Sequence, residues 1–413
     1  MKKDFYIRLQ DRIERLGRYR NKPYRLATKL LWWVMKCCFT PAGYSSKRPI
    51  VNQVNNTVPC LTPKIALLLK GGVGDIVIGG VLSKSLKDKL GDNSQIDLFL
   101  GGAFGICKLL FKEQTFFNAL YKANELDYEK YDLVIELDVY FPKVVYRDCK
   151  VIFTDGFLED YVKTLEDFHQ KFPTITRTDR VFDQMMLLEL LGKNRITCLD
   201  VGNLLGIEPS TLWDIKVDSN VSETVYQKWP QLKKPFITVG RGVDGTNADP
   251  DSIRLWSVEK YNQWIALFKE KFPNVTVVQL GVSKDRCESL DVDLNLLGET
   301  TFEEVLFILK ASALHLDGEC GYVHLRHFLT QAKGLNVVLF GPTSPKIKGY
   351  EENVNIRNDN ICSLKCCEWI AGGTWQSWCI KNGKARAECV ESLTPEYVME
   401  YSYERIKNCF PNN

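Results

Sequence analysis

Short apolar runs alternate with longer amphipathic stretches along most of this chain, and this alternation constrains the fold more than any other feature. The first run, Ile65 to Leu69, is apolar throughout, which is typical of a strand buried on both faces of a parallel sheet. A glycine turn and a helical pattern over 76–90 follow it. Further strands are predicted at 96–100, 133–137 and 151–153. The pattern therefore predicts an α/β fold with a parallel sheet.

The same alternation begins again in the second half of the chain. Strands are predicted at 236–239, 275–280, 313–316 and 336–340, with helices at 258–272 and 302–311. A chain of 413 residues is long enough for two domains with separate cores. We expect an N-terminal arm and linker over 1–60, a first domain over 61–215, a second domain over 216–393 and a C-terminal helix over 394–413.

The charge is distributed unevenly. Residues 1–48 carry thirteen Lys and Arg against three Asp and Glu, so the rest of the chain has a net charge of −7 within a total of +3. A negative body argues against nucleic acid as a partner, because binding to phosphates requires a cationic surface.

The arm also carries an apolar stripe, but no apolar run is long enough to span a bilayer. The longest candidate, Leu30 to Phe39, is interrupted by Lys36. We interpret the protein as cytoplasmic and the arm as a peripheral anchor on the anionic inner membrane. The alternative is that the arm packs on the first domain or forms an oligomer contact.

A glycine-rich turn connects the first predicted strand to the helix that follows it. Lys70-Gly71-Gly72-Val73-Gly74-Asp75 allows the backbone to turn sharply and to approach a ligand with helix-end N–H groups. A dinucleotide fingerprint would need a third glycine at the position of Val77, so an NAD site is disfavoured. A plain tight turn remains the alternative.

Several segments, in this order, resemble those of the heptosyltransferases, glycosyltransferase family nine. The strand and glycine loop ending in Gly74-Asp75 resemble the opening of that family. The later segments that carry the resemblance are Tyr131–Leu137, Arg180–Gly192, Ser252–Tyr261, Leu297–Thr301, Gly318–Leu325, Phe340–Pro345 and Leu393–Val398. The sequence departs from the family pattern at Glu319, where the family has Asp, and at Arg254, where it has Lys.

The resemblance implies a GT-B fold, in which two Rossmann-like domains with parallel sheets face each other across a cleft. It also implies an inverting, metal-independent glycosyltransferase that transfers heptose from ADP-heptose to a lipopolysaccharide core or another surface glycan. Asp75 would be the general base. The donor-binding residues implied are Gly72, Gly74, Arg241, Arg254, Glu319, Cys320, Gly321 and His324.

Structural roles remain open for the three most important of these residues. Asp75 is also placed where a carboxylate caps a helix. Arg254 can pair bidentately with phosphate but is equally suited to a solvated helix start. His324 is as compatible with a buried structural histidine as with a ligand contact.

Five cysteines lie close together near the C-terminus. Cys362, Cys366, Cys379 and Cys389 could provide four thiolates for zinc or iron, with Cys367 able to replace Cys366. The arrangement is similar to the iron-binding finger of autotransporter heptosyltransferases, which modify protein. Free buried thiols are the alternative. A protein O-heptosyltransferase is therefore one competing function. A non-catalytic GT-B binding protein is another, because Glu319 stands where the family has Asp.

Overall fold

A computed structural model describes residues 58–411 of the chain, with gaps. The gaps are 139, 174–180, 209–212, 242–253, 284–286, 330–331, 333, 363–378 and 380–386. The predicted basic arm, Cys366 and Cys367 therefore lie outside the described residues.

The N-terminal lobe is built on a five-stranded sheet with the strand order β4-β3-β2-β5-β6. Its strands are β2 (Lys64–Leu69), β3 (Gln95–Leu100), β4 (Ala119–Lys122), β5 (Leu133–Leu137) and β6 (Lys143–Arg147). Residues 65–69 of the central β2 are all buried, which explains the continuous apolar run. The predicted parallel sheet is confirmed for β4, β3, β2 and β5, and β6, a strand that the sequence analysis did not predict, is added antiparallel to β5 at one edge.

Helices cover this first sheet. They are α3 (Val73–Leu90), α4 (Phe104–Leu110), α5 (Gly156–Lys171) and α6 (Val181–Leu190). Strands β1 (Val58–Cys60) and β7 (Val151–Phe153) form a separate two-stranded sheet. The predicted strand at 151–153 therefore exists but does not join the main sheet.

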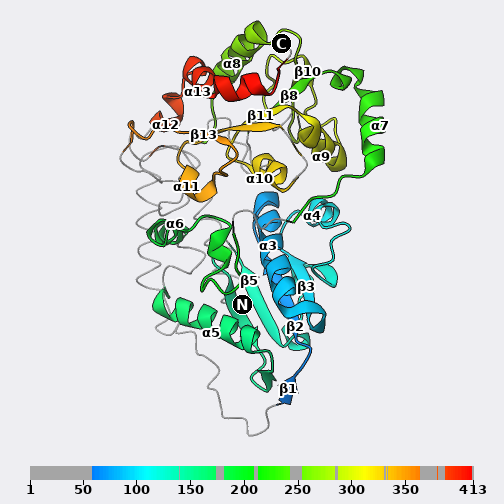
Figure 1. The fold of residues 1–413 in the computed structure, drawn as a ribbon, viewed down its shortest axis with the longest axis vertical. Helices are drawn as coiled ribbons and strands as arrows, with labels where there is room; N and C mark the ends of the chain where they lie inside the picture. Colours follow the sequence, from blue (N-terminus) through cyan, green and yellow to red (C-terminus); the bar gives the residue numbers. More distant parts are fainter. Residues whose placement is uncertain are drawn as a thin grey trace, which may run out of the picture.

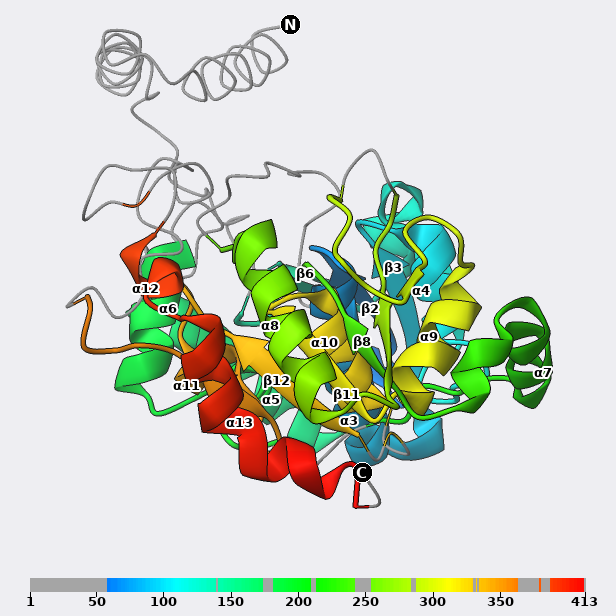
Figure 2. The same ribbon diagram turned by 90° about the horizontal axis from the view of Figure 1, so that it is seen from above.

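The C-terminal lobe has a six-stranded, fully parallel sheet with the order β10-β9-β8-β11-β12-β13. Its strands are β8 (Phe236–Val239), β9 (Thr276–Gln279), β10 (Leu294–Asn295), β11 (Leu314–Gly318), β12 (Leu335–Leu339) and β13 (Val354–Ile356). Its helices are α7 (Ser219–Lys228), α8 (Val258–Lys271), α9 (Phe302–Ala311), α10 (Gly321–Phe328), α11 (Pro345–Lys348), α12 (Glu388–Glu391) and α13 (Pro395–Asn408). Figure 2 shows α13 packed alongside α8.

The two lobes meet where α3 and α10 contact each other, between the two sheets (Figure 1). One hydrophobic core cluster runs through both lobes and includes buried residues of α3, α9 and α10. The chain that joins the lobes is held in the same place. The indole of Trp213 donates a hydrogen bond to the carbonyl of Val77, at 3.0 Å, and its ring lies 5.5 Å from that of Phe328.

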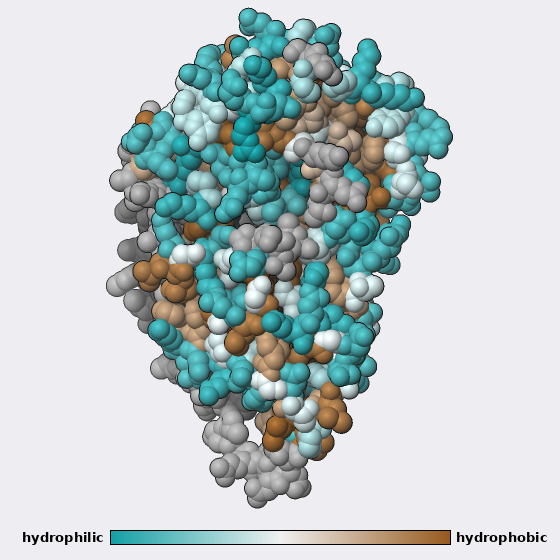
Figure 3. Space-filling view, in the orientation of Figure 1, coloured by the Kyte–Doolittle hydropathy of each residue, from teal (hydrophilic) through white to brown (hydrophobic). Residues whose placement is uncertain are grey.

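Most of the visible surface is hydrophilic (Figure 3). An apolar area lies at the end of the molecule near β1, where Val58, Leu61 and Ile152 are exposed. Within the described ranges, no helix combines the length and apolar character that crossing a membrane requires.

Candidate active site between the lobes

The glycine turn after β2 places Asp75 at the start of α3. Gly71 has a φ of +102°, a conformation that glycine adopts readily, and a side chain there would collide with the Asp75 carboxylate. The backbone N–H of Gly72 donates to Oδ2 of Asp75 at 2.8 Å. Asp75 therefore closes the first turn of the helix from its third position, with Gly72 as the N-cap, and does not itself occupy the cap.

The other carboxylate oxygen of Asp75 has an arginine partner that the sequence did not indicate. The guanidinium of Arg195, which follows α6, forms an ion pair with Oδ1 of Asp75. The Arg195 side chain is 7% exposed, whereas that of Asp75 is 38% exposed. Asp75 is thus held in place and still accessible from the junction between the lobes.

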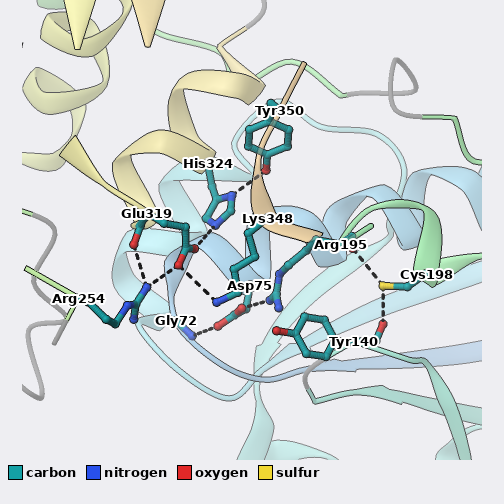
Figure 4. Close-up of polar contacts among 10 residues, drawn as sticks. All are labelled: Gly72, Asp75, Tyr140, Arg195, Cys198, Arg254, Glu319, His324, Lys348 and Tyr350. Atoms are coloured by element: carbon teal, nitrogen blue, oxygen red, sulfur yellow. Dashed lines mark hydrogen bonds and ion pairs between the residues drawn. The ribbon is translucent and has the colours of Figure 1, made fainter. Parts of the chain in front are cut away.

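A buried carboxylate with three polar partners lies on the other side of this junction. Glu319 follows β11, and its Oε2 accepts a hydrogen bond of 2.5 Å from Arg254, which also donates to the Glu319 carbonyl at 2.8 Å. Nζ of Lys348 lies 3.4 Å from the same Oε2, and Nε2 of His324 lies 3.2 Å from Oε1. Figure 4 shows this cluster on one side and the Asp75–Arg195 pair on the other.

The cations of the cluster keep Glu319 ionised. Burial alone raises the pKa of the Glu319 carboxyl, but Lys348, Arg254 and His324 lower this pKa well below its ordinary value of 4.5. Burial lowers the pKa of His324 below 6.5, against the opposing effect of Glu319. With a neutral imidazole, Nε2–H donates to Glu319, and Nδ1 accepts from the Tyr350 hydroxyl at 2.7 Å.

His324 also forms part of the contact between the lobes. A Cβ atom added to Gly74 would lie 2.6 Å from Cδ2 of His324, closer than side chains approach one another. The lobes therefore approach as closely as they do because position 74 is a glycine. This packing and the two hydrogen bonds of His324 give it a structural role in addition to any contact with a ligand.

The remaining predicted donor residues lie in different surroundings. Arg241 is buried; its guanidinium pairs with Glu288 and donates to the carbonyl of Trp256. It does not contact Glu319 through any hydrogen bond or ion pair within the described part of the chain. Cys320 donates through Sγ to Asp317 at 3.2 Å, and burial together with Asp317 raises the pKa of this thiol well above 9.0.

Gly321 begins α10, and open space faces the position that its side chain would occupy. Its backbone therefore has room for close approach by a ligand.

Three of the predicted metal-binding cysteines are described. Cys379 and Cys389 are buried, and Cys362 is partly buried. Burial, with smaller contributions from the nearby Cys379 and Cys362, raises the pKa of the Cys389 thiol to about 11, against the lowering effect of Arg357. The three thiols are thus close enough to interact electrostatically. Across the described ranges, no three His, Cys, Asp or Glu side chains are arranged to hold a metal ion.

The sequence analysis missed Arg195, Lys348 and Tyr350. Arg195 follows the glycine that ends α6, and Lys348 ends α11, a helix of one turn. No periodic pattern covers either position. The only sequence signal is their place in loops next to recognisable segments, the apolar helix for Arg195 and the Phe-Gly-Pro-Thr-Ser-Pro turn for Lys348 and Tyr350.

Comparisons with known proteins rest on structure. No protein-family profile matches the sequence, and no curated protein is significantly similar to it. Solved structures do match. Escherichia coli ADP-heptose lipopolysaccharide heptosyltransferase II has 15% identity and a TM-score of 0.50, over 84% of this chain and 99% of that one. A family-nine glycosyltransferase from Veillonella parvula has 13% identity and a TM-score of 0.50, over 84% and 98% of the two chains.

TibC, an iron-containing dodecameric glycosyltransferase from enterotoxigenic Escherichia coli, has 11% identity and a TM-score of 0.52, over 84% of this chain and 76% of that one. The fold is GT-B. The resemblance to heptosyltransferases is confirmed at the level of the fold. In this GT-B chain, Asp75 belongs to the N-terminal lobe, and the Glu319 cluster belongs to the C-terminal lobe.

Proposed function

We propose that this chain is a glycosyltransferase that transfers heptose from ADP-heptose to a hydroxyl group of a lipopolysaccharide core or another surface glycan. One observation carries the proposal: an accessible carboxylate at the start of α3 faces a cluster of cationic side chains across the junction of the lobes. Transfer of a sugar from a nucleotide diphosphate needs both features, a base for the acceptor and positive charge for the departing diphosphate.

The two sides of the junction would divide the chemistry between them. Asp75 accepts the proton of the acceptor hydroxyl as the new glycosidic bond forms with inversion. Arg254 and Lys348 stabilise the diphosphate that leaves with the electron pair of the broken bond. These charges come from side chains, so the proposed reaction does not require a metal ion. Glu319 holds both cations before the donor arrives.

A protein acceptor is the competing proposal. It is favoured by the thiols of Cys362, Cys379 and Cys389, which lie close enough to affect one another, and by the fold shared with iron-containing TibC. The two acceptors separate in one experiment. The full-length chain is incubated with ADP-heptose and either a heptose-deficient lipopolysaccharide core or an autotransporter passenger protein, and both products are weighed by mass spectrometry.

We expect the core glycan to gain the mass of one heptosyl residue. A mass gain on the passenger protein instead would identify the second function. A panel of other nucleotide sugars tests the donor in the same assay. If no sugar reaches either acceptor while calorimetry still detects nucleotide binding, the chain is a non-catalytic binding protein and the proposal is wrong.

A structural metal is proposed for the cysteine cluster. Cys362, Cys379 and Cys389 are not arranged to hold a metal ion as they stand in the described part of the chain, so they would have to move together around it. Cys366 or Cys367, outside the described residues, would provide the fourth thiolate. We expect about one zinc or iron per chain in protein purified without chelator, and loss of that metal in Cys379→Ser. Metal below about a tenth of one equivalent would exclude the site. Cys107→Ser, at a buried thiol of the N-terminal lobe, is the matched control.

The basic arm is proposed to dock on the cytoplasmic face of the inner membrane. Residues 1–48 carry a net charge of +10, and the exposed apolar residues Val58 and Leu61 lie further along the chain, beyond residues 49–57. We expect the chain to bind anionic vesicles at low salt and to dissociate as the ionic strength rises. The chain without residues 1–48 should stay folded and unbound. Failure of the intact chain to bind at low salt would contradict the proposal.

A further inference from the structure

Arg195 is buried and forms an ion pair with Asp75, the proposed base. Its guanidinium contacts Oδ1 of Asp75, while the N–H of Gly72 donates to Oδ2. Each carboxylate oxygen therefore has a fixed partner and keeps a second lone pair. The carboxylate cannot rotate without breaking one of these contacts, although more than a third of its side-chain surface is open to solvent.

Contacts with both lobes hold Arg195 itself. The centre of its guanidinium lies 4.8 Å from the ring centre of Tyr140, in the N-terminal lobe. Its backbone N–H donates to the carbonyl of Ile347, in the C-terminal lobe, at 2.9 Å. The Ile347 side chain in turn packs into a cluster of the N-terminal lobe made of Tyr140, Phe141, Met185, Leu187, Leu188 and Cys198.

Arg195 is also the cation that determines the charge around Asp75. Tyr140 of the N-terminal lobe lies beside the Asp75–Arg195 pair (Figure 4). On the donor side, His324 packs against the first turn of α3, with Glu319 and Lys348 behind it. His324 is neutral near pH 7, since burial lowers its pKa. Lys348 pairs with Glu319 on the donor side of the junction, whereas Arg195 pairs with Asp75 directly.

We propose that Arg195 is a positioning residue, which holds the Asp75 carboxylate ionised and aimed at the acceptor. The inference rests on the proposed role of Asp75 as base. In the reaction, the acceptor O–H bond breaks and its proton moves to Asp75, the acceptor oxygen bonds to the sugar, and the diphosphate leaves. Before the proton transfer, Arg195 favours the ionised form of the Asp75 carboxylate. During the transfer, it keeps a lone pair of Asp75 directed at the acceptor hydroxyl.

The test is the pH dependence of turnover in Arg195→Gln and Arg195→Lys. Without the guanidinium, Asp75 takes up a proton more readily, so the acid limb of the rate profile should move upward by roughly one to three pH units in Arg195→Gln. Arg195→Lys should restore the position of the limb but not the full rate, because an ammonium lacks the planar fork. The KM for the donor should change less than twofold in both.

The matched control is Arg147→Gln. Arg147 is likewise an arginine of the N-terminal lobe that pairs with a carboxylate, because it lies 2.7 Å from that of Glu159. It differs from Arg195 in lying on β6 and in making no pair with Asp75. Its profile should coincide with that of the wild type. An acid limb at the wild-type pH in Arg195→Gln would overturn the proposal, because a merely structural arginine would lower the rate without moving the limb.

A second measurement needs no catalysis and separates this inference from the proposed function. Carboxyl carbon NMR follows the titration of Asp75 in the substrate-free protein, with Asp75→Asn to assign the signal. We expect the Asp75 signal to titrate at higher pH in Arg195→Gln, and in Arg195→Lys at a pH near that of the wild type. Absence of sugar transfer would contradict the proposed function only. The inference about Arg195 would be refuted if Asp75 titrated at the same pH in the wild type, Arg195→Gln and Arg195→Lys.

Discussion

Asp75 has two possible roles, and a pair of matched variants separates them. Its carboxylate accepts from a backbone N–H at the start of α3, and Asp155 does the same at the start of α5, where it accepts from the N–H of Leu158 at 3.1 Å. Both residues lie in the N-terminal lobe. Only Asp75 faces the donor side of the junction.

Asp75→Ala should therefore lower turnover by about 10²–10⁴-fold while leaving donor affinity nearly unchanged, because a general base acts on the acceptor. Asp155→Ala should lower stability by about 0.5–2 kcal/mol through the lost helix cap, with turnover retained. Steady-state kinetics and calorimetry measure both effects. Equal losses of activity in the two variants would leave Asp75 with a capping role only.

Candidate site residues could be predicted from the sequence where a local pattern contained them. The glycine turn indicated Asp75, and the order of the family-like segments indicated Arg254, Glu319 and His324. The structure brings the latter three into direct contact. Arg241 came from the same reasoning, but its partner is Glu288, which no sequence pattern connects to it.

Arg195 and Lys348 could not be predicted in this way. Each lies at the end of a short or irregular segment. Arg195 contacts Asp75 and Lys348 contacts Glu319, and both partners are more than twenty-five positions away in the sequence. Such contacts follow from the packing of the two lobes, which sequence periodicity does not describe.

Among the elements, the one-turn helix α11 contacts both lobes of the molecule. Ile347 is buried in a cluster of the N-terminal lobe, and the next residue, Lys348, contacts Glu319 of the donor side. The backbone of Ile347 also accepts a hydrogen bond from Arg195. The element thus connects the proposed donor site to the arginine that holds the proposed base.

Ile347→Ala should lower both stability and turnover. Loss of a buried isoleucine side chain costs about 2–5 kcal/mol, and here the empty space would also loosen α11. Ile356→Ala is the control, because Ile356 is equally buried but belongs to the core of the C-terminal lobe alone. We expect similar losses of thermal stability and a larger loss of kcat in Ile347→Ala. Equal kcat values would show that α11 does not connect the sites.

The long buried strands were predictable, and the edge strands were not. Residues 65–69 and 133–137 are apolar or buried throughout, which their sequences indicate. Strand β6 is half-exposed and has only three apolar residues between Lys143 and Arg147, so neither a continuous apolar run nor an alternation marks it. Its antiparallel direction depends on a short connection from β5, which a parallel strand could not have.

For the whole molecule, buried histidines predict how stability depends on pH. Burial lowers the pKa of both His315 and His324 below the ordinary value of 6.5. The unfolded chain therefore binds more protons than the native state as the pH falls below about 6.5. The stabilisation is complete above that pH and is lost as the pH decreases toward the native pKa values.

We expect the free energy of unfolding to decrease on acidification from pH 6.5 to 5, by at most about 1.4 kcal/mol per pH unit for each histidine. His315→Gln should flatten this dependence while preserving a polar group beside Thr238, which lies 2.9 Å from Nδ1 of His315. Urea titrations at several pH values provide the measurement. A variant as pH-dependent as the wild type would show that His315 does not contribute.

The close fit of Gly74 against His324 has a consequence for how the two lobes of this protein can be separated. His324 is held on one side by Glu319 and on the other by Tyr350, so it has little freedom to move aside. One methyl group at position 74 would therefore act as a wedge and push the halves apart by a few tenths of an ångström or more. Gly74→Ala is thus a change of one methyl group that should loosen the contact between the lobes, and a crystal structure of the variant would show by how much they separate.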